Sequence, residues 1–361
     1  MGTVSRLMGV VRLGLTAFLF EWLIDGRTLL IISTESALAW IAAFILYDLC
    51  YYFSHRYGHE WRILWAAHVA HHQSEEFNLS TALRQTSTGY LNAIFYVPLY
   101  LIGFPAEMLI AVGSLNLIYQ FWVHTEHVRR IGFLEYILVT PSNHRVHHAK
   151  NPCYIDRNYG GVFILWDRLF GTFEDERENE PCVYGITEQL NSFNPVWANV
   201  HVYLQGFKDM AAATHWKDKM LLWFKGPGFK PEGTDQEPHD WQAPKFDPEV
   251  TLLVKRYTFV HFWLMVIATF VVLGFQHAIS PLELYLLAGL CLAGFCSLGW
   301  LLEGKRYAFP FEAARMIGSG LVASVVLSQA AVAIAGLVVS LVVVSLGVLF
   351  FGKKQMTLEQ A

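Results

Sequence analysis

Residues 55–72 read HRYGHEWRILWAAHVAHH and hold five histidines in two groups, His55 with His59 and His68 with His71 and His72. On an α-helix, side chains three or four positions apart lie on the same face. The first pair therefore projects from one face of a helix. The HxxHH triplet forms a second, three-pronged face. The stretch predicts helices whose imidazoles can converge on a shared site.

A second HxxHH triplet follows, and 10 of the 15 histidines lie between residues 55 and 148. Neutral imidazole is a ligand for iron, zinc and copper. Eight imidazoles exceed the needs of one ion, but two octahedral ions would use them and keep open positions for O2 or a bridging oxygen. Zinc also fits this donor type, although a structural zinc site closes with four ligands. The predicted metal ligands are His55, His59, His68, His71, His72, His144, His147 and His148.

The alternative is that these histidines are surface or helix-capping residues. That interpretation suits one isolated histidine. It does not suit two HxxHH triplets and an HxxxH motif in so short a stretch, because buried imidazoles need partners. The pattern therefore favours a metal site.

His124 lies between the two triplets, directly after an apolar run. We expect it to be a ninth ligand or to support one. The alternative is a helix-end histidine that bonds the backbone. The remaining histidines are expected to be ordinary structural or surface residues: His127, His201, His215, His239, His261 and His277.

The composition is that of a membrane protein. Of the 361 residues, 54% are hydrophobic and 16% are charged, whereas a soluble domain averages about 25% charged residues. The mean hydropathy is +0.35. The net charge of −4 gives no sign of a nucleic-acid partner, and the five cysteines show no paired spacing.

Apolar runs of the length that a membrane span needs, about 20 residues, recur along the chain. They predict an all-α polytopic membrane bundle. The break at Gly103-Phe104-Pro105 predicts a helical hairpin between two of the runs. The eight predicted spans are 8–24, 37–54, 88–103, 105–123, 257–276, 281–302, 313–328 and 330–351.

The distribution of charge predicts the orientation. Fifteen of the 26 Lys and Arg residues lie in the polar segment 124–256. The positive-inside rule then places both termini and every histidine motif in the cytoplasm, as a histidine-rich helical cap. We expect a catalytic region at 1–250 and a four-helix membrane region at 251–361. Residues 206–224 predict an interfacial amphipathic helix or an ordinary surface helix, and 226–248 predict an extended linker.

Several motifs together resemble one family. They are the three histidine motifs, NLSTALRQ at 78–85, YQFWVHTE at 119–126, DRNYGG at 156–161 and WDRLFGTF at 166–173. Over residues 45–230 the chain resembles the fatty acid hydroxylase/sterol desaturase superfamily, and more narrowly the alkylglycerol monooxygenases within it. The histidine motifs carry the broader resemblance, and the stretches 78–85 and 122–126 carry the narrower one.

The resemblance implies an iron-dependent mixed-function oxidase. Two iron ions would be held by the eight histidines. O2 would hydroxylate the ether-linked alkyl carbon of a glyceryl ether, and the hemiacetal would break into a fatty aldehyde and a glycerol derivative. Tetrahydrobiopterin or another reduced pterin would supply the electrons, with Glu60 at the position of the glutamate associated with the pterin. Because no electron-transfer module is visible in the sequence, we expect a separate electron donor.

The residues around Glu60 leave alternatives open. Arg56 or Arg84 could simply form an ion pair with it. Arg84, with Asn78 and Gln85, could hold the pterin or the substrate head group, or could serve the local structure. We expect the lipid to enter from the bilayer, which spares the cost of exposing its tail to water, ~0.8 kcal/mol per CH2.

Two other functions compete with ether cleavage. One is hydroxylation or desaturation of a fatty acid or sterol, with the same metal site. The other is a non-enzymatic metal-binding membrane protein such as a transporter. A transport path should carry its polar residues along the spans, whereas these histidines gather at one face. The expected location is the inner membrane of a prokaryote or the endoplasmic reticulum of a eukaryote.

Overall fold

The computed structural model describes residues 20, 24, 26–84, 88–234, 240–274 and 280–326. In this part of the chain the regular structure is helical, as predicted, and β pairing is limited to two isolated bridges. The predicted spans 8–24 and 330–351 lie outside the described residues, apart from Phe20 and Ile24.

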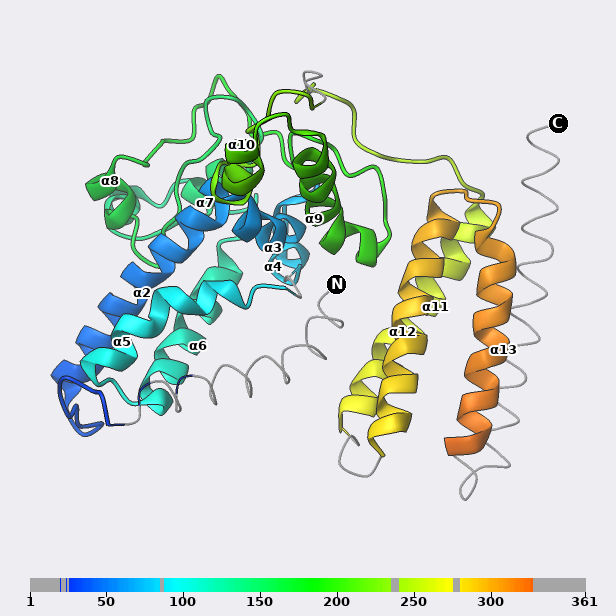
Figure 1. The fold of residues 1–361 in the computed structure, drawn as a ribbon, viewed down its shortest axis with the longest axis horizontal. Coiled ribbons are helices and arrows are strands. Elements are labelled where there is room, and N and C mark those ends of the chain that lie inside the picture. Colours follow the sequence, from blue (N-terminus) through cyan, green and yellow to red (C-terminus); the bar gives the residue numbers. More distant parts are fainter. Residues whose placement is uncertain are drawn as a thin grey trace. The chain divides into compact units, whose positions relative to one another are not determined.

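Three of the described helices are long and apolar enough to cross a membrane: α2 (Ala37–Glu60), α11 (Leu252–Gly274) and α12 (Pro281–Leu302) (Figure 1). The predicted span 37–54 thus continues for six more residues and carries the first histidine pair on its last turns. The Ser36 hydroxyl caps its first turn by accepting a hydrogen bond from the Ala39 amide at 3.3 Å.

The predicted hairpin at Gly103 is present. The preceding run forms η1 (Leu91–Tyr96) and α5 (Val97–Ile102), and the following run forms α6 (Ala106–Trp122). Gly103 has a φ of 114°, and a Cβ there would meet the Leu30 carbonyl oxygen at 1.9 Å. Only glycine fits this turn. The helical part of the run 88–103 is one apolar stretch, Leu91–Ile102, which is shorter than the length of about 20 residues that a span needs.

The described residues form two compact units. One comprises the residues up to 190 together with 199–244, and the other comprises 191–198 together with those from 245 onward. In the first unit, α2 packs against α5 and α6. Its apolar core contains Ala43, Leu99, Phe104, Met108, Leu109 and Val112.

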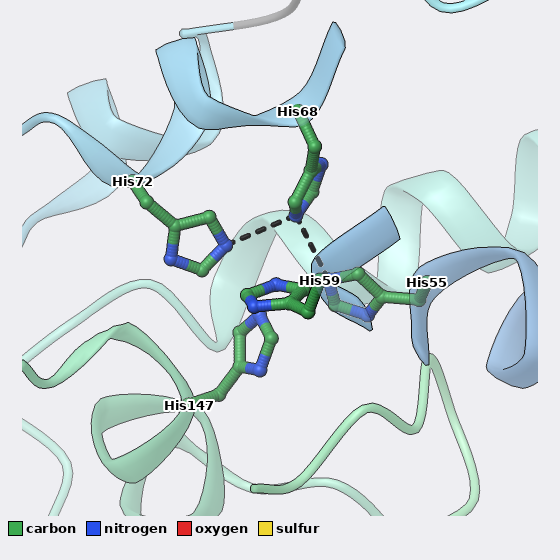
Figure 2. A group of neighbouring side chains, drawn as sticks. All are labelled: His55, His59, His68, His72 and His147. Carbon is green, nitrogen blue, oxygen red and sulfur yellow. Dashed lines mark hydrogen bonds between the residues drawn. The ribbon is translucent and has the colours of Figure 1, made fainter. Parts of the chain in front are cut away.

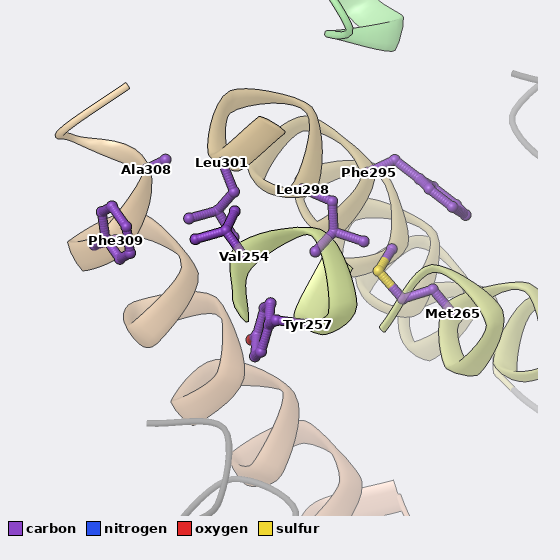
Figure 3. Packing of buried hydrophobic residues seen from close by; sticks show 8 residues of the cluster. All are labelled: Val254, Tyr257, Met265, Phe295, Leu298, Leu301, Ala308 and Phe309. Atoms are coloured by element: carbon purple, nitrogen blue, oxygen red, sulfur yellow. The ribbon is translucent and has the colours of Figure 1, made fainter. Parts of the chain in front are cut away.

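The second unit consists mainly of α11, α12 and α13 (Ala308–Val326), which begins five residues earlier than the predicted span. An apolar cluster joins the three helices, with Tyr257 of α11 and Leu298 of α12 among its members (Figure 3). Beside it, the buried Glu312 carboxylate accepts a hydrogen bond from the Tyr257 hydroxyl at 2.7 Å and pairs with Arg315 at 2.5 Å. The buried charge is thus compensated on its own helix.

The polar middle of the chain folds into short helices around the end of α2. They are α3 (Arg62–His72), α4 (Leu79–Ala82), η2 (Gly132–Tyr136), α7 (Pro141–His148), α8 (Leu165–Phe170), α9 (Pro195–Ala212), α10 (Trp216–Leu221) and η3 (Leu222–Phe224). Arg62, at the start of α3, forms a buried ion pair with Asp209 of α9 at 2.5 Å and also donates to the Phe229 carbonyl. This ion pair fixes α3 within the first unit.

Residues 206–224 do not form one helix. The chain leaves α9 at Ala212, turns, and continues as α10 and η3. Gly206 explains the return, because a Cβ there would lie 2.5 Å from the ring of Trp223. The missing side chain lets the indole of η3 pack directly on α9. Among the described residues, 226–248 are non-helical, as the linker prediction requires.

Candidate metal centre

The histidines lie near the ends of helices, and the local sequence determines where these helices begin and end. α2 ends because Trp61 adopts an extended conformation, and α3 begins at the next residue. The short break redirects the chain, so that the histidines of α3 turn back toward those of α2. α7 begins with Pro141 at its first position, and Thr140 and Asn143 form a reciprocal capping box.

A first group of imidazoles combines α2, α3 and α7. The His68 Nε2 atom lies 3.1 Å from His55 Nε2 and 3.0 Å from His72 Nε2 (Figure 2). His59 and His147 complete the group, and one ring nitrogen from each of the five residues lies within 4.8 Å of all the others.

A second group combines α3, the residue two positions after α6, and α7. The His124 Nε2 atom lies 3.3 Å from His71 Nε2 and 3.0 Å from His144 Nε2. His148 Nε2 lies 3.1 Å from His144 Nε2. These four nitrogens also lie within 4.8 Å of one another. His124 therefore joins the eight histidines of the motifs.

Each HxxHH triplet is divided between the two groups, which differs from the single three-pronged face predicted. His68 and His72 belong to the first group, and His71 belongs to the second. Successive residues of a helix are about 100° apart, so the fourth residue after His68 is displaced by about 40° and the third by about 60° in the opposite sense. In α7 the same rule keeps His144 with His148 and sends His147 to the other group.

Three of the imidazoles have a defined tautomer. His55 Nδ1 donates to the Tyr159 carbonyl at 2.8 Å, His124 Nδ1 to the Gln120 carbonyl at 2.8 Å, and His147 Nδ1 to the Arg157 carbonyl at 3.0 Å. A neutral imidazole carries one N–H, so each Nε2 presents a lone pair to its group. This is how a histidine is oriented toward a metal ion.

Burial keeps the imidazoles of the two groups neutral. Loss of solvation is the largest cause that lowers the pKa of His68, and nearby imidazoles lower it further. The same two causes act on the pKa values of His144 and His148. Burial lowers the pKa of His124 to about 4. Neutral imidazole is the form that binds metal.

The spacing of the nitrogens fits a coordination sphere. Two ligands at right angles on one ion, each about 2.0–2.1 Å away as in zinc–imidazole bonds, lie about 3 Å apart. The Nε2–Nε2 separations of 3.0 to 3.3 Å match this value. His59 Nε2 and His147 Nε2 are buried in the first group without a hydrogen-bond partner among the described residues. A metal ion would satisfy both atoms.

A non-helical strap over residues 156–163 supplies two of the orienting carbonyls. Asp156 and Asn158 have φ values of 61° and 57°, in the left-handed region. The side-chain Nδ2 of Asn158 donates to the Asn143 backbone carbonyl at 3.0 Å. The side-chain Oδ1 of Asn158 accepts from the Glu174 backbone amide at 2.9 Å. These bonds place the carbonyls on either side of Asn158 against the first group. Sequence reasoning did not single out Asn158, and the Asn-Tyr-Gly-Gly turn signal is the feature that could have done so.

Asp48 does not join the histidines, although helical spacing puts it on the face of His55. Its Oδ1 accepts from the Val162 amide at 2.8 Å and from the Asn116 side chain at 2.6 Å. Its Oδ2 accepts from the Phe163 amide and the Trp166 indole, both at 3.0 Å. The carboxylate anchors the strap to α2.

Glu60 and Arg84 lie in different surroundings. Glu60 is about one-third exposed and pairs with Arg56 at 2.8 Å, so the ion pair expected as an alternative is present. Arg84 instead donates to the Ala70 carbonyl of α3 at 3.3 Å. Near Glu60, the Asp156 carboxylate lies 3.8 Å from His59 Nδ1. Gln85 lies outside the described residues.

The isolated histidines stay outside both groups. His215 pairs with the exposed Glu232 at 3.1 Å, and His261 stacks on Tyr257 in the second unit. His127 is exposed and His201 is partly buried. His239 and His277 lie outside the described residues.

Comparison with known proteins gives a consistent result. Residues 40–172 match the fatty acid hydroxylase family. The chain is 37% identical over 325 residues to alkylglycerol monooxygenase of Homo sapiens, and 36% identical over 336 residues to that of Danio rerio. Each match covers 88% of this chain and 72% of the relative. Ornithine lipid hydroxylase OlsE of Rhizobium tropici is 30% identical over 152 residues, 42% of this chain and 46% of that protein. No solved structure matches this chain.

The apolar helices and the gathered histidines define a membrane protein with a site that can bind metal. The chain belongs to the fatty acid hydroxylase family and, over most of its length, to the group of the alkylglycerol monooxygenases within it. It is therefore an enzyme, an oxidoreductase that acts on lipids.

Proposed function

We propose that this enzyme is a di-iron monooxygenase that cleaves the ether bond of alkylglycerols, with O2 as oxidant and a reduced pterin as electron donor. The observation that carries the metal part is the division of nine histidines into two convergent groups. The names of the relatives that match most of the chain support the ether substrate.

His55, His59, His68, His72 and His147 would hold one ion, and His71, His124, His144 and His148 the other. The two ions together would activate O2 for insertion of one oxygen atom into a C–H bond. The protein keeps the imidazoles neutral by burial. It fixes the direction of His55 and His147 through carbonyls of the strap and that of His124 through the Gln120 carbonyl. Two adjacent residues, His71 and His72, contribute to different groups, so α3 would hold the two ions close together.

The overall reaction balances with two electrons and two protons. One oxygen atom of O2 enters the alkyl carbon next to the ether oxygen, and the other leaves as water. The hemiacetal product then breaks its C–O bond and yields a fatty aldehyde and a free glycerol hydroxyl. Because the apolar helix α2 ends at the site, a long alkyl chain can reach the site from the bilayer. This route avoids a cost of ~0.8 kcal/mol for each CH2 exposed to water.

Glu60 is the residue we propose for contact with the donor. It follows His59 directly, and its carboxylate is partly exposed. The pyrimidine edge of a pterin carries an N–H and an amino group, which a carboxylate can accept as paired hydrogen bonds. Arg84 contacts α3 at the residue before His71, and we propose that it also helps to bind the pterin.

The test uses purified full-length protein loaded anaerobically with ferrous iron. A reduced pterin, O2 and a mixture of alkylglycerol, fatty acid and sterol are then added. We expect two irons per chain and one fatty aldehyde for each O2 consumed. A hydroxylated fatty acid or sterol without aldehyde would refute the ether assignment, and an iron content near one would refute the paired site.

A Glu60→Gln variant separates donor binding from metal binding. Losing one charged hydrogen-bonding partner, worth about 1.5–3 kcal/mol, should raise the KM for pterin by roughly tenfold or more. The iron content should not change. Glu178→Gln, at an exposed carboxylate, is the matched control. A normal KM in Glu60→Gln would contradict the role of Glu60.

A further inference from the structure

The short helices η2 and α8 carry large apolar side chains that remain strongly exposed among the described residues. Leu169 is 68% exposed, Phe133 71% and Tyr136 64%. A cluster of this kind is unusual on a surface that faces water. We name it the η2–α8 patch, and it consists of Phe133, Tyr136, Ile137, Leu165, Leu169 and Phe170.

The two helices present one continuous surface because the backbone joins them. The Ile164 amide donates to the Ile137 carbonyl at 3.0 Å, and the Val139 amide donates to the Val162 carbonyl at 2.8 Å. The Arg168 guanidinium lies 5.0 Å from the centre of the Tyr136 ring. The patch is therefore a feature of the folded unit and not of two separate loops.

The contacts of the α8 region with α2 define the depth of the patch. Phe163 meets Phe44 with ring centroids 6.0 Å apart, and Phe170 meets Tyr52 at 5.3 Å and Phe53 at 5.1 Å. α2 has 24 residues and is about 36 Å long, whereas the hydrocarbon core of a bilayer is about 30 Å thick. Phe44 lies about 10 Å and Phe53 about 24 Å from the start of the helix. A hydrocarbon core of this thickness, placed anywhere within the length of α2, includes both positions.

In the strap beside α8, backbone N–H groups donate to protein carboxylates, as a position inside the hydrocarbon region requires. Non-helical backbone persists in the hydrocarbon region only where protein groups satisfy its N–H groups. Asp48 accepts the amides of Val162 and Phe163. Asp167 accepts the Tyr159 amide at 2.7 Å and the Gly160 amide at 2.8 Å. Two buried carboxylates thus replace water as acceptors along the strap.

The charges around the patch fit a lipid surface. Arg129 and Arg168 are exposed beside it, whereas Arg130 pairs with the exposed Asp175 at 3.9 Å. In the stretches 129–138 and 163–171 the two carboxylates, Glu135 and Asp167, are both buried. Exposed cations in two stretches that expose no carboxylate suit the anionic head groups of phospholipids.

We propose that the η2–α8 patch is embedded in the bilayer leaflet next to the histidine end of α2. The segment predicted as entirely cytosolic would then be partly re-entrant. The patch continues the lipid-facing surface of α2, and its occupant is acyl chain rather than a protein partner. This proposal does not depend on the identity of the substrate or of the metal.

The test places a nitroxide label at Leu169→Cys in full-length protein whose five native cysteines are replaced, reconstituted in lipid nanodiscs. Glu178→Cys, on an exposed polar loop of the same unit, is the matched control. Collisions of the label with O2, which partitions into lipid, and with a water-soluble nickel chelate are measured. We expect the label at Leu169 to show more collisions with O2 and fewer with nickel than the label at Glu178.

Two outcomes would overturn the proposal. A label at Leu169 that meets nickel as often as the control does would place the patch in water. A label shielded from both O2 and nickel would show that a protein surface covers it. A second label at Leu165→Cys guards against a local effect of one substitution, and an unchanged melting temperature shows that each labelled protein is folded.

Discussion

Replacing Asp48 by asparagine tests whether the strap depends on a buried carboxylate. Asp48 accepts four hydrogen bonds, two at each oxygen. Asparagine keeps one oxygen and puts an NH2 group in place of the other. In either orientation of the new amide side chain, its NH2 group faces two N–H donors that formerly bonded a carboxylate oxygen, so both of those hydrogen bonds are lost.

The magnitude follows from these lost bonds. A hydrogen bond to a charged group contributes about 1.5–3 kcal/mol, so the loss of two should cost about 3–6 kcal/mol. At about 2–4 °C per kcal/mol, the melting temperature should fall by roughly 6–24 °C. The strap also carries the Tyr159 carbonyl that orients His55, so metal content should fall as well.

The assay is thermal unfolding of detergent-solubilised protein, followed by metal analysis. Asp175→Asn is the control, because that carboxylate is 60% exposed and its contact with Arg130 is 3.9 Å long. An exposed pair of this kind contributes about 0–1 kcal/mol. If Asp48→Asn melts within about 2 °C of this control, the strap does not depend on the carboxylate in the way we describe.

Three further predictions concern the site and its support. His71→Ala and His72→Ala should each lose one of two irons, with different spectroscopic signatures for the ion that remains; identical signatures would contradict the division into two groups. Because the pKa of His124 is lowered in the folded state, the unfolded state binds a proton at a higher pH than the folded state does. Metal-free protein should therefore lose about 3 kcal/mol of stability from this group as the pH falls from 7 to 4. A melting temperature that does not change over this pH range would oppose the assignment. Asp209→Leu should cost about 3–5 kcal/mol in denaturant unfolding because it leaves Arg62 buried and unpaired, and Arg62→Met in the same chain should recover part of it.

Much of the helical framework could be predicted from the sequence. Apolar runs marked the long helices, and the Gly-Phe-Pro break at 103–105 marked the hairpin. These are local signals, because length, hydropathy and turn chemistry act within one segment. The run 88–103 and the stretch 206–224 were harder. The helical part of 88–103 is limited to Leu91–Ile102, and in 206–224 the packing of Trp223 on Gly206 sets the fold of the chain.

The metal chemistry was also accessible from the sequence. Spacing of three and four residues selects helical faces, and imidazole is a ligand whatever the fold around it. The sequence therefore determined which eight residues converge and named His124 as a candidate for a ninth. It could not determine which imidazole meets which, because each helix presents two neighbouring directions.

Helical periodicity separates the middle histidine of each triplet from the other two, but only the tertiary structure decided which of these subsets meet in each group. The angle at which α3 and α7 approach α2 sends His72 and His147 to one group and His71 and His148 to the other. It also turned Asp48 away from the histidines and toward a strap more than a hundred residues later in the chain. Helical periodicity is a property of one segment, whereas these choices depend on how distant segments pack. That is why the sequence identified the candidate ligands and the fold determined how they are grouped.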